Sequence, residues 1–237
     1  MFVDTTHRSD APEIMDNFQM EGEILRDALD KIASINRLLG GNKVTLEGII
    51  YLLRAQPKST LIRITDIGCG NGDMLRALAD YAEKNELNFM LTGIDANNFT
   101  IEHARSLSSG YKNISYECID IFEELHQQKS ADIILCTLTL HHFKDQEIIA
   151  LLQSFQRTAR LGFVINDLQR SAIAYYLFLG LCFVFRLNAM SREDGLVSIL
   201  RGFKRNDLMS FSKTLGLKYY FIKWKWAFRY QWIVKTA

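Results

Sequence analysis

The sequence predicts an α/β fold with a doubly wound parallel sheet that ends in an antiparallel pairing. Three observations support this fold class. Short β-rich runs alternate with helical segments, a glycine-rich turn follows the first run, and the last two runs are joined by a very short link. A link that short can join only antiparallel strands. Because 237 residues suffice for one packed domain with an accessory segment, we expect a single sheet.

The first 57 residues are expected to form a helical segment that precedes the sheet domain at 58–237. Apolar residues recur at steps of three and four between Leu25 and Leu39, which is typical of an amphipathic helix, and Gly40-Gly41 supplies a stop. A second, short helix is predicted over about 45–54.

From residue 58 onward, strands and helices alternate. Strands are predicted at 61–67, 89–94, 114–119, 132–138 and 161–165, with helices between them at 73–84, 100–107 and 146–158. The last two strands, at 217–224 and 228–234, are placed to form the antiparallel hairpin. Between the fifth strand and this hairpin, about residues 168–215 are expected to be a helical insertion.

Composition narrows the class of protein further. The formal net charge is +1, so the overall charge does not favour nucleic acid as a partner. A hydrophobic content of 48% excludes wholesale disorder. The four cysteines are scattered without CxxC spacing, which argues against a zinc site and favours a reducing, cytoplasmic location; no metal is expected. No secretory signal is visible, and the longest apolar stretch, 172–185, is too short to span a bilayer.

The first predicted strand leads into a glycine-rich turn with the sequence Asp66-Ile67-Gly68-Cys69-Gly70-Asn71-Gly72-Asp73. Glycines let a nucleotide-like ligand approach the backbone because no Cβ blocks it. Dinucleotide-binding enzymes need a third glycine where Asp73 stands, and a carboxylate there would repel a pyrophosphate. Asp66 instead suits a ligand with a cationic end, such as S-adenosylmethionine (SAM). Taken alone, the turn is also explained as a tight connection.

Two further acids close the next two predicted strands. Asp95 lies about twenty-five residues beyond the turn, close to the spacing at which an acid accepts hydrogen bonds from ribose hydroxyls. Asp120 could accept a hydrogen bond from an adenine amino group, with Ile121 packing on the ring. An acid alone at a strand end is more often a helix N-cap than a ligand contact. Three acids after three successive strands, beside a glycine turn, favour a cofactor site.

These segments resemble class I SAM-dependent methyltransferases, in particular the ubiquinone/menaquinone-biosynthesis-like branch. The matching segments are Thr65–Gly72, Thr92–Ala96, Cys118–Asp120, and Ala131–Cys136 running into Leu140–Phe143. The resemblance covers about residues 60–165. It implies a Rossmann-like, seven-stranded sheet with its last strand antiparallel, SAM as cofactor with S-adenosylhomocysteine (SAH) as product, and N-terminal helices that fold over the cofactor as a lid.

The resemblance also implies a set of cofactor-binding residues. Gly68 and Gly70 would approach the methionine part, Asp95 would hold the ribose, Asp120 with Ile121 would hold the adenine, and Cys136 would lie near the cofactor. The complete set of predicted cofactor residues is Asp66, Gly68, Cys69, Gly70, Asp95, Ala96, Asp120, Ile121 and Cys136.

Three residues are candidates for catalysis. The protein must align the acceptor with the methyl carbon, and a base helps only if the acceptor must lose a proton. His141 and His142 follow the fourth predicted strand and Asp167 ends the fifth, so each lies near the expected acceptor. Alternatively, the histidines only shape the loop by bonding the backbone, and Asp167 caps the following helix.

The segment Ala172 to Phe185 bears most directly on the acceptor. It is apolar all round, unlike an ordinary surface helix. We expect it to line a pocket for a small apolar acceptor of secondary metabolism: a phenol, quinone, polyketide or lipid-like molecule, methylated on oxygen or carbon. The alternatives are burial against the N-terminal helices, a homodimer interface, or peripheral membrane contact.

Two other functions stay open. A tRNA- or protein-modifying methyltransferase should show a basic cleft and an open acceptor channel. A non-catalytic protein could keep the SAM fold for binding alone. Nucleic acid is not expected as a partner, because alternation along the hairpin explains the basic, aromatic run Lys223–Tyr230 and no Asn-Pro-Pro-Tyr-like motif is present.

Overall fold

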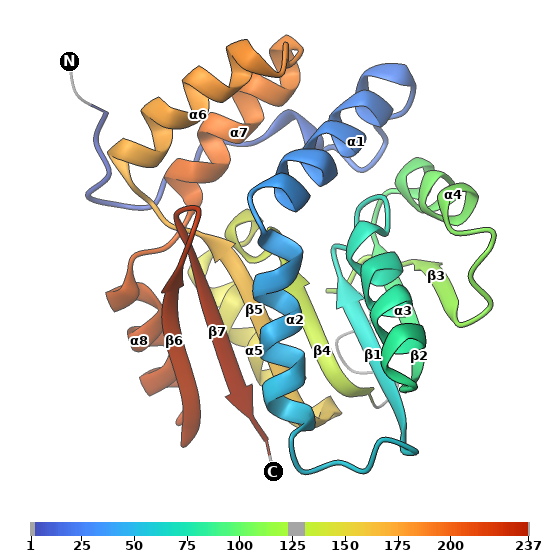
Figure 1. Cartoon of the computed structure of the whole chain (residues 1–237). Coiled ribbons are helices and arrows are strands. Elements are labelled where there is room, and N and C mark those ends of the chain that lie inside the picture. Colours follow the sequence, from blue (N-terminus) through green and yellow to red (C-terminus); the bar gives the residue numbers. More distant parts are fainter. Residues whose placement is uncertain (1–2, 123–130, 237) are drawn as a thin grey trace.

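The computed structural model describes residues 3–122 and 131–236. A seven-stranded sheet with the order β3-β2-β1-β4-β5-β7-β6 forms its centre (Figure 1). The strands are β1 (Leu61–Ile67), β2 (Asn88–Asp95), β3 (Ile114–Cys118), β4 (Ala131–Thr137), β5 (Ala159–Leu168), β6 (Tyr219–Lys225) and β7 (Arg229–Lys235). Strands β1 to β5 pair in parallel, and β7 pairs antiparallel with both β5 and β6. The predicted sheet with its antiparallel last strand is confirmed.

Helices surround this sheet. They are α1 (Glu23–Leu38), α2 (Gly41–Leu53), α3 (Asp73–Asn85), α4 (Asn98–Leu107), α5 (Asp145–Thr158), α6 (Ala172–Val184), α7 (Ala189–Arg201) and α8 (Arg205–Thr214), with short 3-10 helices η1 (Ile14–Asp16) and η2 (Leu140–His142). The predicted helices differ from these bounds by a few residues at most, and the fifth strand is longer than expected at both ends, because it begins directly after α5 and pairs with β7 as far as Leu168.

The alternation along β4 shows why both faces of the sheet are covered. Ile133 and Leu135 belong to the hydrophobic core shared with α2, α3 and α4, whereas Ile134 and Cys136 belong to the core shared with α5 and α8. A strand that is apolar on both sides cannot be left open to water, as is usual for parallel sheets. The result is a three-layer sandwich.

The predicted N-terminal segment divides at Gly40. This residue adopts φ +76°, a conformation that favours glycine, and α2 begins at the next residue, slightly earlier than predicted. A Cβ on Gly41 would fall 1.8 Å from the side-chain oxygen of Asn36, so the close approach of α2 needs a glycine there. Helix α2 packs against β5 and β7 and so belongs to the sheet layers. A lid role for the segment stays a prediction, carried by the residues before Gly40.

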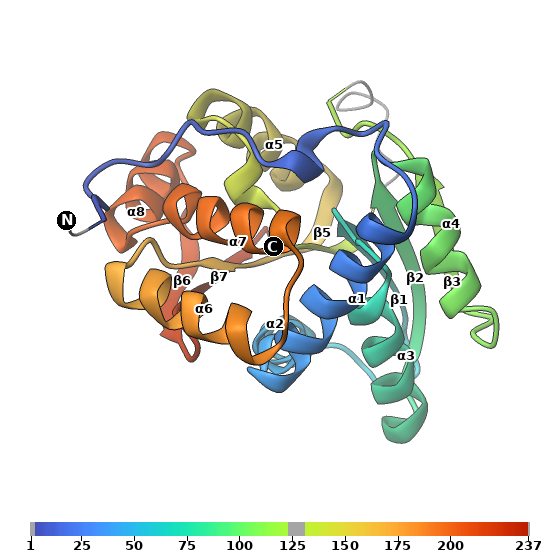
Figure 2. The same cartoon turned by 90° about the horizontal axis from the view of Figure 1, so that it is seen from above.

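Three pieces of chain, of which the first two are contiguous and the third is distant in sequence, lie beyond the carboxyl ends of the parallel strands. They are residues 3–22 with η1, helix α1, and the pair α6–α7 (Figures 1 and 2). Helix α7 contacts α6, α1 and η1, while α8 returns to pack against β6. Among residues 3–122 and 131–236, every helix falls short of the length and apolarity that crossing a membrane requires.

Candidate active site

A cavity of about 1580 Å³ lies at the carboxyl edge of the sheet. Strands β1 and β4 are neighbours at which the strand order reverses, and ligands of open α/β sheets bind at such a point. The turn after β1 and helix η2 after β4 both line the cavity. Because ordinary ligand pockets measure about 300–1,000 Å³, this one has room for a nucleotide-sized cofactor and a second molecule.

The glycine turn is shaped for the close approach of a ligand. Gly68 adopts φ +69° and its N–H donates to the Ile94 carbonyl over 2.8 Å, while a Cβ there would meet the Thr139 side chain at 2.3 Å. A Cβ on Gly70 would instead meet only a side-chain carbon of Leu29, at 3.9 Å. The space beside Gly70 is therefore open to the cavity.

The side chain of Asp66 is buried and poorly satisfied. The residue is only 2% exposed, and Oδ1 has no hydrogen-bond partner among the described residues. Burial, and next the neighbouring Asp95, raises the pKa of Asp66 to about 7. Cys69, also on the cavity wall, is buried as well, and burial raises the pKa of its thiol. A carboxyl in this state would gain most from a cationic ligand.

We expect Asp66→Asn to stabilise the ligand-free protein at pH 8 by roughly 4 kcal/mol. The folded state keeps a proton on Asp66 up to about pH 7, whereas the unfolded chain loses it near the ordinary value of 3.8. The free energy of unfolding therefore falls as pH rises from about 4 to about 7. Asparagine does not titrate, so the variant should not lose this stability. Urea unfolding at pH 4 and pH 8 measures it: the variant should match the wild type at pH 4 and exceed it at pH 8. If the variant and the wild type were equally stable at pH 8 as well as at pH 4, Asp66 would not be protonated in the folded protein.

Asp95 holds the glycine turn in place. Its Oδ2 accepts the Gly70 N–H over 3.2 Å, and Oδ1 accepts the Asn97 N–H over 3.1 Å. Burial raises the pKa of Asp95 against these hydrogen bonds. The cap of α4 is Asn97, whose side chain accepts the Thr100 N–H, so Asp95 is not that helix's N-cap. Asp95 and its neighbour Ala96 line the cavity.

The remaining predicted cofactor residues divide into two groups. Asp120 and Ile121, after β3, line the same cavity, and Asp120 accepts the Phe122 N–H over 2.9 Å. Cys136 is fully buried in the core of the sheet and is absent from the cavity wall, where Thr137 takes its place. We therefore leave Cys136 out of the proposed site.

His141 and Asp167 form a buried pair. The imidazole Nδ1 lies 2.6 Å from Oδ1 of Asp167, and the His141 backbone N–H donates to Oδ2 over 3.2 Å. Burial alone would raise the pKa of Asp167, but His141 outweighs it and holds this pKa below its usual value. The N-cap of α6 is Ser171, which accepts the Ala174 N–H, so the alternative role of Asp167 as a cap is wrong.

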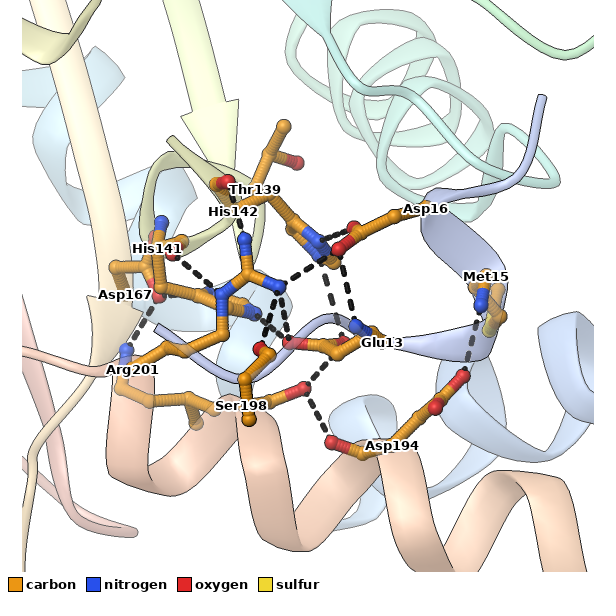
Figure 3. A network of polar contacts seen from close by, with 12 residues as sticks. Glu13, Met15, Asp16, Thr139, His141, His142, Asp167, Asp194, Ser198 and Arg201 are labelled. Atoms are coloured by element: carbon orange, nitrogen blue, oxygen red, sulfur yellow. Dashed lines mark hydrogen bonds and ion pairs between the residues drawn. The ribbon is translucent and has the colours of Figure 1, made fainter. Parts of the chain in front are cut away.

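His142 is held by the N-terminal segment. Its Nδ1 lies 2.7 Å from Oδ1 of Asp16, and Arg201 from α7 donates to the other oxygen of Asp16 over 2.7 Å (Figure 3). The two imidazole rings thus bond carboxylates, whereas the sequence had left open that they bond only the backbone. Arg201 also donates to the backbone carbonyls of both histidines, which fixes η2 against α7.

Glu13 completes this cluster and was not predicted from the sequence. It is 6% exposed and lies against both histidine rings, with Ser198 donating to its Oε2 over 2.8 Å (Figure 3). Burial raises the pKa of Glu13 to about 7, against the lowering effects of His142 and Ser198. Asp194 anchors the segment by accepting the N–H groups of Ile14 and Met15.

Helix α6 supplies the apolar wall. The α6 residues that line the cavity are Ala174, Leu177, Phe178, Gly180, Leu181 and Val184. The helix packs mainly against α7. This contact argues against the alternative that α6 is buried by the N-terminal helices. On its outer side, Ile173 and Phe183 are 65% and 87% exposed. One helix therefore presents an apolar surface both to the cavity and to the exterior.

Comparison with known proteins agrees with this geometry. Residues 58–173 match the family model described as a methyltransferase domain. The plantazolicin methyltransferase BpumL, solved with SAH, superposes with a TM-score of 0.68 at 17% identity over 90% of this chain and 93% of that one. Magnesium protoporphyrin IX methyltransferase from Synechocystis PCC 6803, also with SAH, gives 0.54 at 15% identity over 83% and 82%.

A third solved structure, the CurJ carbon methyltransferase, gives a TM-score of 0.60 at 14% identity over 82% of this chain and 54% of that one. No curated protein matches the sequence. At these identities the superpositions show the class I methyltransferase fold, and the family match covers residues 58–173 of that fold.

Proposed function

We propose that the chain transfers the methyl group of SAM to a small, apolar acceptor, and the match of residues 58–173 to the model of a methyltransferase domain supports this proposal. The observation that carries the proposal is the pairing of two features in one cavity. One part of the cavity wall holds the buried Asp66, whose Oδ1 lacks a hydrogen bond, and the glycine turn that is bonded to Asp95. Another part is formed by the apolar side chains of α6.

The cofactor half of the cavity fits the parts of SAM in turn. Asp66 would offer a partner to the cationic amino-acid end, and the open backbone at Gly70 would admit it closely. Asp95 would accept hydrogen bonds from the ribose hydroxyls. Asp120 with Ile121 would hold the adenine at the end of β3. When bound, SAM supplies an activated methyl group, so the protein's own residues have only to align the acceptor and exclude water.

The acceptor half has an apolar wall and one polar end. Helix α6 would hold an apolar body, while His141, His142 and Glu13 would orient the acceptor's heteroatom. A phenol, quinone, polyketide or lipid-like acceptor, methylated on oxygen or carbon, fits this division. The three solved structures are named for plantazolicin, for magnesium protoporphyrin IX and for methylation of carbon, which supports a small-molecule acceptor of secondary metabolism.

Location and partners follow from the same features. The four cysteines are unpaired, which is consistent with the reducing cytoplasm. The outward apolar side of α6, with Ile173 and Phe183, is where a homodimer contact or a peripheral membrane contact would form. Both contacts remain predictions.

Calorimetric titration of the purified chain with SAM, SAH and NAD tests the proposal. We expect micromolar binding of both sulfur compounds and no binding of NAD. A screen for SAH release against phenolic, quinone, polyketide and lipid acceptors, with unmodified tRNA and a protein mixture as further arms, then finds the acceptor class. NAD binding alone would overturn the cofactor assignment. SAM binding with no acceptor in any arm would favour the non-catalytic alternative.

A further inference from the structure

Three side chains at the polar end of the cavity converge on one point. Glu13, His141 and His142 each offer one donor atom, and these three atoms lie within 4.8 Å of one another (Figure 3). Nε2 of His141 is 3.8 Å from Oε1 of Glu13, and Nε2 of His142 is 3.9 Å from Oε2. These separations are too long for hydrogen bonds. Two bonds of about 2.1 Å to a shared metal ion would span up to about 4.2 Å, so both pairs fit such an ion.

Two of these atoms are buried without a hydrogen bond, and the Arg201 guanidinium lies 3.8 Å from one of them, Oε1 of Glu13. Nε2 of His141 and Oε1 of Glu13 are shielded from solvent and have no hydrogen bond among the described residues. The two residues are 2% and 6% exposed. Buried polar atoms normally find a partner, and an exception calls for an explanation such as a bound ion. Here the two atoms that lack a hydrogen bond face each other over 3.8 Å.

The other atoms of the cluster are already oriented. Nδ1 of His141 bonds Asp167 over 2.6 Å, and Nδ1 of His142 bonds Asp16 over 2.7 Å. With each Nδ1–H donated to a carboxylate, each Nε2 keeps its lone pair for a ligand. Metal-binding histidines are held by carboxylates in this same way. Ser198 in turn fixes Glu13 by donating to Oε2.

We infer that Glu13, His141 and His142 bind one divalent transition-metal ion, and that the ion is zinc. Two imidazoles and one carboxylate are a donor set that zinc accepts, with the fourth position left for water or a substrate atom. The site uses no cysteine, so the lack of CxxC spacing in the sequence is no argument against it. Because Glu13 precedes α1 and the histidines follow β4, the ion would also fasten residues 3–22 over the cavity.

This inference deepens the proposed function, and it rests on that function only for the role of the ion. Zinc in this place would hold the heteroatom of the acceptor at its open coordination position. Whether the ion binds is a separate question that needs no acceptor and no SAM. The two proposals can therefore fail independently.

Titration with zinc chloride tests the site. The full chain, freed of any polyhistidine tag and stripped with EDTA, should bind one zinc per chain with sub-micromolar affinity. Cobalt in its place should give the visible absorption bands of a four-coordinate ion. Glu13→Gln and His142→Gln should each weaken zinc binding at least ~100-fold. Asp167→Asn, which removes the charge that supports His141 but no proposed zinc ligand, should weaken it by about 10–100-fold.

A matched control is His103→Gln, which removes a histidine that also pairs with a carboxylate, that of Asp30, away from this cluster. It should bind zinc like the wild type. Stoichiometric binding that survives in both Glu13→Gln and His142→Gln would overturn the inference, as would the absence of binding to the wild type. Parallel SAM titration of the same samples separates the two proposals, since zinc binding without SAM binding would contradict only the proposed function.

Discussion

Asp95→Ala is expected to weaken SAM binding at least ~100-fold while the fold is retained. The substitution removes the proposed acceptor for the ribose hydroxyls, and each charge-assisted hydrogen bond is worth about 1.5–3 kcal/mol. It also releases the N–H groups of Gly70 and Asn97, so the glycine turn loses its anchor before any ligand arrives. Isothermal calorimetry measures the loss, and circular dichroism checks the fold.

Two further variants sharpen this experiment. Asp95→Asn keeps one acceptor oxygen in place without the charge, so we expect an intermediate loss of about tenfold. Asp80→Ala removes an exposed acid of α3 that bonds Tyr111 outside the cavity, and SAM should bind it as it binds the wild type. If Asp95→Ala binds SAM at wild-type strength, the ribose assignment is wrong.

The sequence could bring together the residues of the proposed cofactor half because its signals are local. Asp66, Gly68 and Gly70 fall within five residues of one strand end, and Asp95 and Asp120 end the next two strands. Parallel strands bring their carboxyl ends to one edge, so sequence order alone places these residues together. The apolar run at α6 was recognisable for a similar reason, since no ordinary surface helix lacks a polar face.

The polar end of the cavity could not be predicted in this way. Glu13 and Asp16 meet His141 and His142 across more than a hundred positions of sequence, and Arg201 joins them from α7. Residues 3–22 carry no periodic pattern that would indicate where they lie. Their path depends on tertiary contacts such as those of Asp194 with the backbone at Ile14 and Met15.

The Asp167 alternatives illustrate the same limit. An acid between a strand and a helix fits an N-cap by local rules. Strand β5, however, extends to Leu168, so Asp167 still lies within the sheet, and Ser171 becomes the cap. The extra length comes from pairing with β7, in which Asp167 lies opposite Tyr230. Only the partner strand decides where such a strand ends.

His141→Ala is expected to lower kcat at least ~100-fold with the acceptor found by screening, while the Kd for SAM changes less than about twofold. General acid–base groups and metal ligands at a reacting centre contribute effects of about this size or more. SAM affinity should survive because the polar atoms of His141 bond Asp167 and face Glu13, and none bonds the glycine turn. Turnover is measured as SAH release, with His103→Gln as the matched control.

Chelation then decides how His141 acts. If its Nε2 itself accepts the proton of the acceptor, activity survives EDTA treatment and is lost only in the variant. If zinc holds the acceptor between Glu13 and the histidines, EDTA alone reduces the wild type to the level of His141→Ala, and added zinc restores the wild type but not the variant. Loss of SAM binding together with turnover would contradict both roles, because His141 would then support the structure of the whole cavity.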